Sequence, residues 1–509
     1  METKTAAIEM RNITKRFGPV LANDKVWLNI YRGEILALLG ENGSGKTTLM
    51  NMLSGIYFPD EGEIKIDGKE VVIRSPKDAF DNGIGMIHQH FKLVDVLTAA
   101  ENIVLGLPGK LDLKAASAKI REICDKYGFS VDPTQKIYDM SVSQKQTVEI
   151  VKVLYRGADI LILDEPTAVL TPQETDKLFA VLRNMRNDGK AIVIITHKMH
   201  EVEALSDRVA ILRHGQFIGD MLTKDTNAQE MTNMMVGHAV SLNIDRPDPV
   251  DPKPRVEVKG LTVRSVDGII KLDDVSFTAN SGEILGIAGI SGCGQKELLE
   301  AIAGLQTVES GSISYIEDDG SREELIGKDP LSIAELGVSL SFVPEDRLGM
   351  GLVGNMNLAD NMMLRSFRRG KSIFTDRRSP RALAESVVQE LSVSTPSVDT
   401  PVRRLSGGNV QKVLVGREIA SAPTVLLTAY AVRGLDIHSS YTIYDLINRQ
   451  KKAGVAVIFV GEDLDVLLEL CDRILVLCGG KVSGIVPGRG AEKREVGMMI
   501  TKLGGQSHE

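Results

Sequence analysis

The chain has 509 residues, enough for roughly two to four domains at ~150 residues per domain. Hydrophobic residues make up 43% and charged residues 25%, which excludes a largely disordered chain. The 68 acidic side chains outnumber the 60 basic ones and give a net charge of −8, which argues against a general binder of polyanions.

The lengths of the apolar runs and the spacing of the cysteines further limit the class of protein. The longest apolar runs, such as 35–39 and 455–460, have the length of strands and fall far short of the ~20 residues that cross a bilayer. The chain begins Met-Glu-Thr-Lys-Thr without an apolar segment, so we expect no secretory signal. The four cysteines lack CxxC spacing and are interpreted as reduced thiols of a cytosolic protein.

The first half of the chain has the pattern of a mixed α/β unit. Short apolar runs at 35–39, 160–163 and 192–195 are typical of buried parallel strands, and 174–188 is predicted to be a helix between them. Residues 98–157 are predicted to be mostly helical, as in an inserted subdomain. We therefore predict a mixed β core that carries a helical insertion.

This pattern occurs twice. The glycine pattern GxxGxG that begins at Gly40 recurs from Gly289, and Asp207-Arg recurs as Asp472-Arg. The second copy carries extra residues between its glycine pattern and its later motifs. One fold therefore occurs twice in the chain, and the two copies have diverged.

A proline-rich stretch, Arg246-Pro-Asp-Pro-Val-Asp-Pro-Lys-Pro254, lies between the copies. Proline fixes φ and lacks a backbone donor, so this stretch is predicted to be a stiff, extended linker. We therefore predict domains at 1–245 and 256–509, joined by a linker at 246–255.

A phosphate-binding loop is predicted from Gly-Glu-Asn-Gly-Ser-Gly-Lys-Thr, which matches GxxxxGK[ST] between a predicted strand and a predicted helix. Glycines let backbone N–H groups close around phosphates, and the start of the helix adds partial positive charge. Lys46 would reach the β- and γ-phosphates, and the Thr47 hydroxyl would bind Mg²⁺. The nucleotide-binding residues predicted here are Gly40, Glu41, Asn42, Gly43, Ser44, Gly45, Lys46, Thr47 and Thr48.

Two carboxylates follow the predicted strand at 160–163. Asp164 could hold the Mg²⁺ shell, and Glu165 could orient or deprotonate the attacking water. An Asp-Glu pair after an apolar strand is usually only a solvated strand end. Its position downstream of a phosphate loop favours the catalytic interpretation.

With these motifs the sequence resembles the ATP-binding subunits of ABC transporters along nearly its whole length. The resemblance implies that the chain binds and hydrolyses ATP with Mg²⁺. It further implies that Phe17 stacks on adenine, that Gln89 contacts Mg²⁺ and senses a membrane partner, and that His197 faces the γ-phosphate. The residues it assigns to catalysis are Glu165, His197 and Gln89, and those it assigns to the metal are Thr47, Gln89 and Asp164.

The most family-specific motif lies in the second copy. Leu405-Ser-Gly-Gly-Asn409 matches the ABC signature LSGGQ, with Asn in the last place. The resemblance implies that Ser406, Gly407 and Gly408 close on the γ-phosphate across a domain interface. Small residues are needed there because the serine and the backbone amides must approach the phosphate.

Elsewhere the second copy departs from the family pattern. In its phosphate loop Gln295 stands in place of the lysine and Lys296 in place of Ser or Thr, while Ala429 and Tyr430 replace the two carboxylates. We expect no hydrolysis there, although Lys296 could keep weak nucleotide binding. The other altered positions are Glu345 for the Gln-loop residue, Glu462 for the switch histidine and a position near Val266 for the adenine-stacking aromatic.

The signature of the first copy is altered in turn, because Val142 and Ser143 stand where two glycines are expected. ABC domains pair head to tail, so the resemblance implies that the intact loop faces the intact signature and that the two damaged motifs face each other. The hypothesis is one catalytic and one degenerate composite site within a single chain whose two domains pair. The degenerate site would contain Gly289, Gly294, Gln295, Lys296, Ser141 and Ser143.

Tandem ABC domains with a degenerate second half and the element Pro344–Arg347 resemble importers of sugars and nucleosides. The strings at 87–93, 100–106 and 164–172 favour nucleoside importers that are fed by receptor lipoproteins of the basic-membrane-protein type. A monosaccharide importer is the alternative. The implied partners are two transmembrane permease subunits or domains and an extracytoplasmic substrate-binding lipoprotein, and the implied location is peripheral, at the cytoplasmic face of the cell membrane.

Two other classes fit the sequence less well. Soluble tandem ABC proteins that act on ribosomes or DNA generally keep both sites intact and use a long, charged, helical linker, so no nucleic-acid partner is expected. A nucleotide-gated scaffold without hydrolysis is disfavoured by the presence of both Glu165 and His197.

One basic stretch is not explained by these functions. Residues 365–381 hold seven basic side chains, opposed within the stretch only by Asp376: Arg365, Arg368, Arg369, Lys371, Arg377, Arg378 and Arg381. A solvated surface of the helical subdomain is the favoured interpretation. Contact with anionic lipid headgroups is the alternative.

Overall fold

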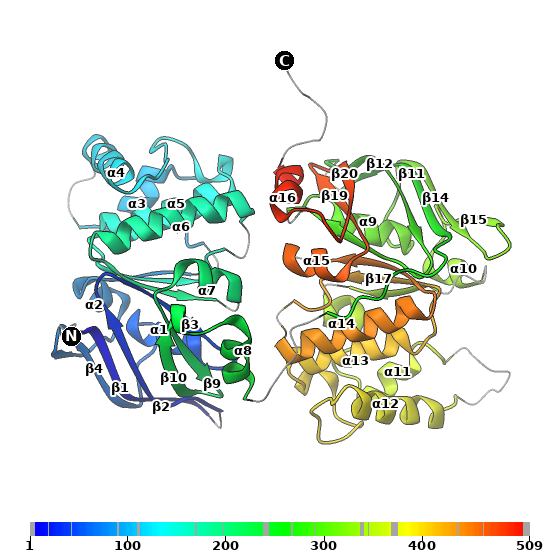
Figure 1. Ribbon diagram of the computed structural model, residues 1–509, viewed down its shortest axis with the longest axis horizontal. Coiled ribbons are helices and arrows are strands. Elements are labelled where there is room, and N and C mark those ends of the chain that lie inside the picture. The colour runs from blue at the N-terminus through cyan, green and yellow to red at the C-terminus, as the bar shows by residue number, and fades with distance from the viewer. Residues whose placement is uncertain are drawn as a thin grey trace, which may run out of the picture. The chain divides into compact units, whose positions relative to one another are not determined.

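The chain divides into two compact units, Met1–Ser241 and Leu242–Glu509. The computed structural model (Figure 1) describes residues 6–18, 20–41, 43–88, 91–108, 112–167, 170–196, 198–237, 244–265, 268–290, 292–335, 340–344, 346–367, 375–433, 435, 437–461 and 463–501. None of the helices within these ranges is both long enough and apolar enough to span a bilayer.

The first unit contains two β-sheets. A smaller antiparallel sheet has the strand order β2-β1-β4-β5, and a larger sheet has the order β10-β9-β3-β8-β7-β6. In the larger sheet β10 is antiparallel to its neighbour, and the other strands run parallel. The strands are β1 (Ala6–Phe17), β2 (Val20–Tyr31), β3 (Glu34–Leu39), β4 (Glu61–Ile66), β5 (Lys69–Val71), β6 (Ile84–Ile87), β7 (Ile160–Asp164), β8 (Ala191–Ile195), β9 (Arg208–Arg213) and β10 (Gln216–Leu222).

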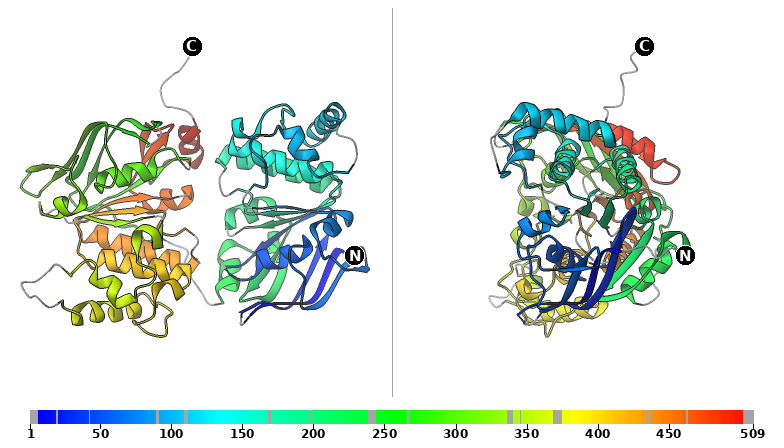
Figure 2. Two further views of the ribbon diagram at one scale, coloured as in Figure 1. Left: turned by 180° about the vertical axis from the view of Figure 1, so that it is seen from behind. Right: turned by 90° about the vertical axis from the view of Figure 1, so that its left-hand side faces the viewer.

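The helical insertion predicted at 98–157 is confirmed. Helices α3, α4 and α5 lie together at the end of this unit that is far from β1, β2 and β4, in both Figure 1 and Figure 2. The helix predicted at 174–188 is α6. The helices of the first unit are α1 (Lys46–Leu53), α2 (Pro76–Asp81), α3 (Ala99–Val104), α4 (Leu113–Tyr127), α5 (Val142–Tyr155), α6 (Pro172–Asn187), α7 (Met199–Leu205) and α8 (Ala228–Val236).

The second unit repeats this architecture. Its sheets have the orders β12-β11-β14-β15 and β16-β17-β18-β13-β19-β20, and the second order matches the large sheet of the first unit position by position. Its strands are β11 (Pro254–Arg264), β12 (Ile270–Asn280), β13 (Ile284–Ala288), β14 (Ser310–Ile316), β15 (Arg322–Glu324), β16 (Leu340–Val343), β17 (Val425–Ala429), β18 (Ala456–Val460), β19 (Arg473–Cys478) and β20 (Lys481–Pro487). Its helices are α9 (Gln295–Ile302), α10 (Pro330–Glu335), α11 (Leu358–Met363), α12 (Arg378–Glu390), α13 (Gly407–Ile419), α14 (Ile437–Lys452), α15 (Leu464–Leu470) and α16 (Lys493–Thr501).

The three apolar runs that the sequence marks as strands are the centre of the core. Every residue of β3, β7 and β8 is buried, with helices packed against the sheet. Because these strands are parallel, their carboxyl ends meet at one edge of the sheet, which is where α/β proteins bind ligands. The loops that leave this edge therefore carry the site.

The proline-rich stretch is held against the second unit. The buried guanidinium of Arg246 donates a hydrogen bond to the carbonyl of Cys471, and the Lys451 ammonium donates one to the carbonyl of Pro247. Pro254 is the first residue of β11, a position where a strand tolerates proline. The division between the compact units therefore falls a few residues before this stretch, because buried cations anchor it to one side.

Two of the basic side chains at 365–381 have structural partners. Arg365 donates a hydrogen bond of 3.0 Å to Glu418, a fully buried carboxylate that also pairs with Arg417 at 2.8 Å. Arg381 forms a surface pair with Asp399. The stretch is therefore not a uniformly unpaired basic surface, while Arg368, Arg369 and Lys371 lie outside the described residues.

The buried carboxylate of Glu418 allows a stability prediction. Replacing Glu418 with Ala is expected to lower the free energy of unfolding by about 3 kcal/mol, because Arg417 would remain buried without its partner. Urea denaturation followed by circular dichroism measures this loss. Arg381→Ala, which breaks an exposed pair, is the matched control and should cost under about 1 kcal/mol. Equal losses for both variants would contradict the structural role of Glu418.

Candidate functional site

The loop between β3 and α1 has the backbone conformation that its glycines permit. Gly45 has φ of 94°, and a Cβ at this position would lie 2.3 Å from the carbonyl oxygen of Ala22. A Cβ on Gly40 would lie 2.3 Å from Ser44 Oγ. Only glycine fits at these two positions, so the backbone can wrap closely around a bound group. Asn42 lies outside the described residues.

Lys46 is held inside this loop. Its side chain is buried, and Nζ donates to the carbonyl oxygens of Gly40 at 2.7 Å and Glu41 at 2.9 Å. Burial lowers the pKa of Lys46, and the nearby charges of Glu165 and Asp164 oppose that shift. Among the described residues, the buried Ser44 hydroxyl has no hydrogen-bond partner. A buried ammonium and a hydroxyl without a partner fit the oxygens of a phosphate chain.

Thr47 and Asp164 bring two oxygen donors together. Thr47 Oγ1, at the start of α1, lies 3.2 Å from Asp164 Oδ2, at the end of β7. Burial raises the pKa of Asp164 and Glu165 adds to this, whereas the Thr47 hydrogen bond and Lys46 act in the opposite direction. A hydroxyl beside a carboxylate is a hard oxygen donor set, which suits Mg²⁺. The residues present therefore fit the predicted metal.

Glu165 occupies a tight turn beyond β7. Its φ of 47° lies in the left-handed region, and its N–H donates to the carbonyl oxygen of Ile195 at 2.9 Å. A side-chain-bearing residue rarely adopts this conformation, and it is kept only where the surroundings fix it. The turn thus ties Glu165 to the end of β8. Gln89 and His197 lie outside the described residues, so their roles stay predictions.

Phe17 lies at the end of β1 with an accessible ring. The side chain is 41% exposed, and its ring meets Tyr57 edge-on with 5.1 Å between centroids. The Lys15 ammonium lies 5.6 Å from the same ring. An exposed, laterally supported aromatic ring can stack on a base, as predicted.

The second unit keeps the loop but not the charge. Gly294 has φ of 98°, and the buried Gln295 donates to the Ile290 carbonyl at 3.0 Å, as Lys46 does to Glu41. Lys296 instead lies on the outside of α9, 3.8 Å from Glu300. The cation that could compensate for the missing lysine is therefore paired with a carboxylate of its own helix.

The second unit also keeps the backbone turn that carries Glu165 in the first unit. Tyr430 has φ of 53°, and its N–H donates to the Val460 carbonyl at 2.9 Å, the same arrangement as at Glu165. The Arg433 guanidinium lies 5.9 Å from the Tyr430 ring. Ala429 is buried and has no side-chain oxygen, and Tyr430 carries a phenol in place of a carboxylate. The second unit therefore keeps the backbone turn without the two carboxylates, and its lack of hydrolysis stays a prediction.

The two signature motifs begin their helices in different ways. Ser141 caps α5, where its hydroxyl accepts from the Gln144 N–H at 3.3 Å and the Gln144 side chain accepts from the Ser141 N–H at 2.8 Å. The hydroxyl of Ser406 makes no such cap and accepts from the Asn409 amide at 2.9 Å. Arg347 donates to the carbonyl of Gly407 at 3.2 Å and to the carbonyl of Arg433. The intact signature is therefore fixed from outside its helix.

The structure brings together Lys46, Thr47 and Asp164, and it fixes Glu165 beside them. Ser406, Gly407 and Gly408 belong to the second unit, so their approach to the first phosphate loop stays a prediction. Sequence reasoning missed Glu201, a buried acid in α7 that hydrogen-bonds residues beside this site. Its only sequence signal is its place four residues after His197, where a solvent-facing helical glutamate is equally typical.

Comparison with known proteins adds independent findings. Residues 23–168 and 272–428 match the protein family described as ABC transporter. The chain is 42% identical over 510 residues to a nucleoside import ATP-binding protein of Lactococcus lactis, with 99% of each chain covered. It is 40% identical over 500 residues to a guanosine import ATP-binding protein of Bacillus subtilis, with 97% of each covered. It is 39% identical over 536 residues to a glucose import ATP-binding protein of Haloferax volcanii, covering 98% of this chain and 96% of that one.

Proposed function

This chain is a member of the ABC transporter family, and we propose that it is the ATP-hydrolysing subunit that energises nucleoside import through a membrane permease complex. The observation that carries the ATPase assignment is the joined set of Lys46, Thr47 and Asp164, with Glu165 fixed in the adjoining turn. The similarity to a nucleoside and a guanosine import protein at 42% and 40% identity supports the cargo class.

ATP hydrolysis at the first phosphate loop follows from the chemistry of these residues. Phe17 stacks on adenine, and Lys46 with Ser44 binds the phosphates. Thr47, Gln89 and Asp164 would hold Mg²⁺, which would supply positive charge to neutralise the charge that develops on the transferred phosphoryl group. Glu165 orients the attacking water and takes its proton on the carboxylate. His197 acts as the switch histidine toward the γ-phosphate.

Each chain forms one catalytic and one degenerate ATP site by pairing its two ABC domains, 1–245 and 256–509. Ser406, Gly407 and Gly408 complete the catalytic site against the first phosphate loop. The degenerate site combines the loop from Gly289 to Lys296 with the altered signature at Ser141 and Ser143. The replacement of Lys46 and Glu165 by Gln295 and Tyr430 in the second copy supports this asymmetry.

Matched serine substitutions test this pairing. Ser406→Ala is expected to slow steady-state ATP hydrolysis by roughly ten- to a hundredfold, because a hydroxyl would no longer bond a charged phosphate oxygen. Ser141→Ala should leave hydrolysis unchanged and instead lower the free energy of unfolding by about 1 kcal/mol, because it removes the α5 cap. A slower rate for Ser141→Ala with a normal rate for Ser406→Ala would reverse the assignment of the two sites.

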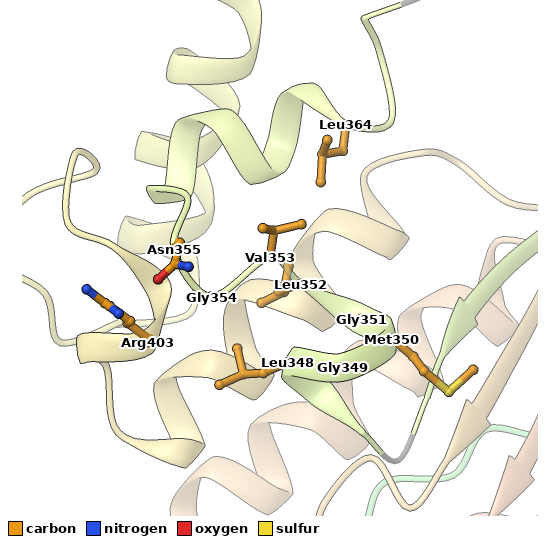
Figure 3. Close-up of a pocket in the computed structure, with 10 residues that line it drawn as sticks. All are labelled: Leu348, Gly349, Met350, Gly351, Leu352, Val353, Gly354, Asn355, Leu364 and Arg403. Atoms are coloured by element: carbon orange, nitrogen blue, oxygen red, sulfur yellow. The ribbon is translucent and has the colours of Figure 1, made fainter.

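A pocket formed by residues that follow the Gln-loop position of the second unit in the sequence supports a membrane partner. The pocket has a volume of about 470 Å³, and Figure 3 shows Asn355 and Arg403 together at one end of it. Its lining residues are Leu348, Gly349, Met350, Gly351, Leu352, Val353, Gly354, Asn355, Leu364 and Arg403. Leu348 and Val353 are exposed, as are Val94 and Val96 after the Gln-loop of the first unit. Exposed aliphatic side chains of this kind suit contact with short cytoplasmic helices of a permease.

The partners follow from this assignment. The chain would bind two transmembrane permease subunits or domains as a peripheral protein at the cytoplasmic face of the cell membrane. An extracytoplasmic lipoprotein would deliver the substrate to the permease. ATP would hold the two ABC domains together, and hydrolysis would release them, so that one two-state element drives the permease.

Transport by the reconstituted complex tests the cargo. The chain, its permease and its receptor lipoprotein would be placed in proteoliposomes, and ATP-dependent uptake of guanosine, ribose and glucose would be compared. Guanosine uptake is the expected result. Uptake of a sugar alone would establish the second candidate, a monosaccharide importer, which the 39% identity to a glucose import protein supports. Glu165→Gln serves as the inactive control.

A further inference from the structure

We propose that Glu201 is a positioning residue for ATP hydrolysis, which ties the turn that carries Glu165 to the segment that leads into His197. Glu201 lies in α7, and only 3% of its surface is exposed. Thr196 Oγ1 donates to one oxygen of its carboxylate at 3.1 Å, and Thr167 Oγ1 donates to the other oxygen. Both threonines are as deeply buried as the glutamate.

The two threonines connect this carboxylate to the catalytic edge of the sheet. Thr167 follows Glu165 by two residues, beyond β7. Thr196 directly follows Ile195, the last residue of β8, whose carbonyl accepts the hydrogen bond from the Glu165 N–H. Glu201 therefore adds a side-chain bridge to the backbone bond that already links these strand ends. The bridge spans the two segments on which two of the predicted catalytic residues, Glu165 and His197, lie.

Lys198 completes the arrangement. Its Nζ lies 3.2 Å from Glu201, and its N–H donates to Thr196 Oγ1 at 3.1 Å. An ionised carboxylate that accepts from two hydroxyls and an ammonium makes charge-assisted bonds, which are shorter and stronger than neutral ones. Such a network can hold the unfavourable φ of Glu165, because a strained residue persists only where several contacts fix it.

The second unit shows that the fold does not require this network. The register pair of Asp164 with Ile195 corresponds to that of Ala429 with Val460, and the backbone bond from Tyr430 to Val460 is kept. By this register the residues at the positions of Thr167, Thr196, Glu201 and Lys198 are Val432, Gly461, Val466 and Asp463. The turn thus forms without a buried carboxylate where no catalytic glutamate is present. The hydrogen-bond network around Glu201 therefore occurs in the unit that has Glu165 and is absent at the corresponding residues of the unit that lacks it.

Glu201 acts through Glu165 and its neighbours, since it bonds the framework and is not assigned to ATP or Mg²⁺. This inference rests on the proposed ATPase function. Displacing a catalytic group lowers the rate of hydrolysis much more than it lowers the affinity for ATP, because a misplacement of ~1 Å can reduce a rate by about a hundredfold. Phosphate binding by Lys46 and Thr47 does not depend on the bridge. The proposal therefore predicts an effect on kcat with little effect on KM.

Steady-state ATPase kinetics of the full chain test the proposal. Glu201→Gln, which keeps the shape but cannot accept from all three donors, is expected to reduce kcat by about ten- to a hundredfold and to change KM for ATP less than about threefold. Thr196→Val should also reduce kcat with little change in KM, but by a smaller factor. Val466→Ala, at the corresponding position of α15, is the matched control and should leave kcat unchanged.

A double substitution separates positioning from general stability. Adding Glu201→Gln to Glu165→Gln should produce no further loss of rate, because the bridge has no catalytic carboxylate left to position. Unfolding midpoints are measured for each variant. If Glu201→Gln lowers the midpoint but leaves kcat unchanged, or if its loss of rate adds fully to that of Glu165→Gln, the residue is only structural and the proposal is overturned. Undiminished hydrolysis by Glu165→Gln alone would instead refute the proposed function.

Discussion

Replacing Glu165 with Gln is expected to reduce steady-state ATP hydrolysis by roughly 10²–10⁴-fold, the range for loss of a general base. The amide cannot accept the proton of the attacking water. The turn at Glu165 has φ of 47°, which Gln adopts no more easily and no less easily than Glu, so the geometry should survive. ATP affinity, measured by equilibrium binding of a fluorescent ATP analogue, should change little because Lys46 and Thr47 remain.

Tyr430→Phe is the matched control in the second unit, because Tyr430 occupies the same backbone turn without a carboxylate. This variant should hydrolyse ATP at the normal rate. Comparable losses for the two variants would refute the assignment of catalysis to the first unit alone.

Replacing Lys46 with Gln is expected to weaken ATP binding by about 10³-fold and to abolish hydrolysis at working ATP concentrations. The substitution converts the first phosphate loop to the pattern of the second, where Gln295 donates to a loop carbonyl but carries no charge. A lost charge contact at 4 Å amounts to about 4 kcal/mol at an effective dielectric constant near 20. Isothermal titration with Mg-ATP measures the change.

Gln295→Ala is the control for this second prediction. It removes a buried amide from the corresponding place in the second loop and should leave hydrolysis by the full chain intact. If Gln295→Ala impaired hydrolysis as strongly as Lys46→Gln, the second loop would be catalytic and the asymmetry would be wrong.

The parts of the fold that were predictable are those with a local pattern. The buried runs that became β3, β7 and β8 are continuous and apolar, so their burial could be inferred without knowledge of their neighbours. The phosphate loop could be predicted as well. Only glycine fits at Gly40 and Gly45, so the loop leaves a recognisable spacing of glycines in the sequence. The same spacing revealed the internal repeat.

What could not be predicted depends on residues that are distant in the sequence. The pairing of Glu418 with Arg365 could not be predicted, because Glu418 lies in α13 and Arg365 lies beyond α11. From the sequence alone, Arg246 would be predicted to be an exposed linker residue, because its contact with Cys471 is not apparent. Glu201 would be predicted to be a solvent-exposed helical acid, because its hydrogen bond with Thr167 is not apparent from the sequence. In each case a charge is buried only because the tertiary fold brings its partner to it.

The turn at Tyr430 has a consequence for how the two halves diverged. Its φ of 53° is unfavourable for a tyrosine, yet the second unit still forms it and bonds it to Val460. The conformation of this turn is thus kept at a position where no acid is present. The two units therefore share this backbone turn and differ in the side chain that it carries, a carboxylate at Glu165 and a phenol at Tyr430.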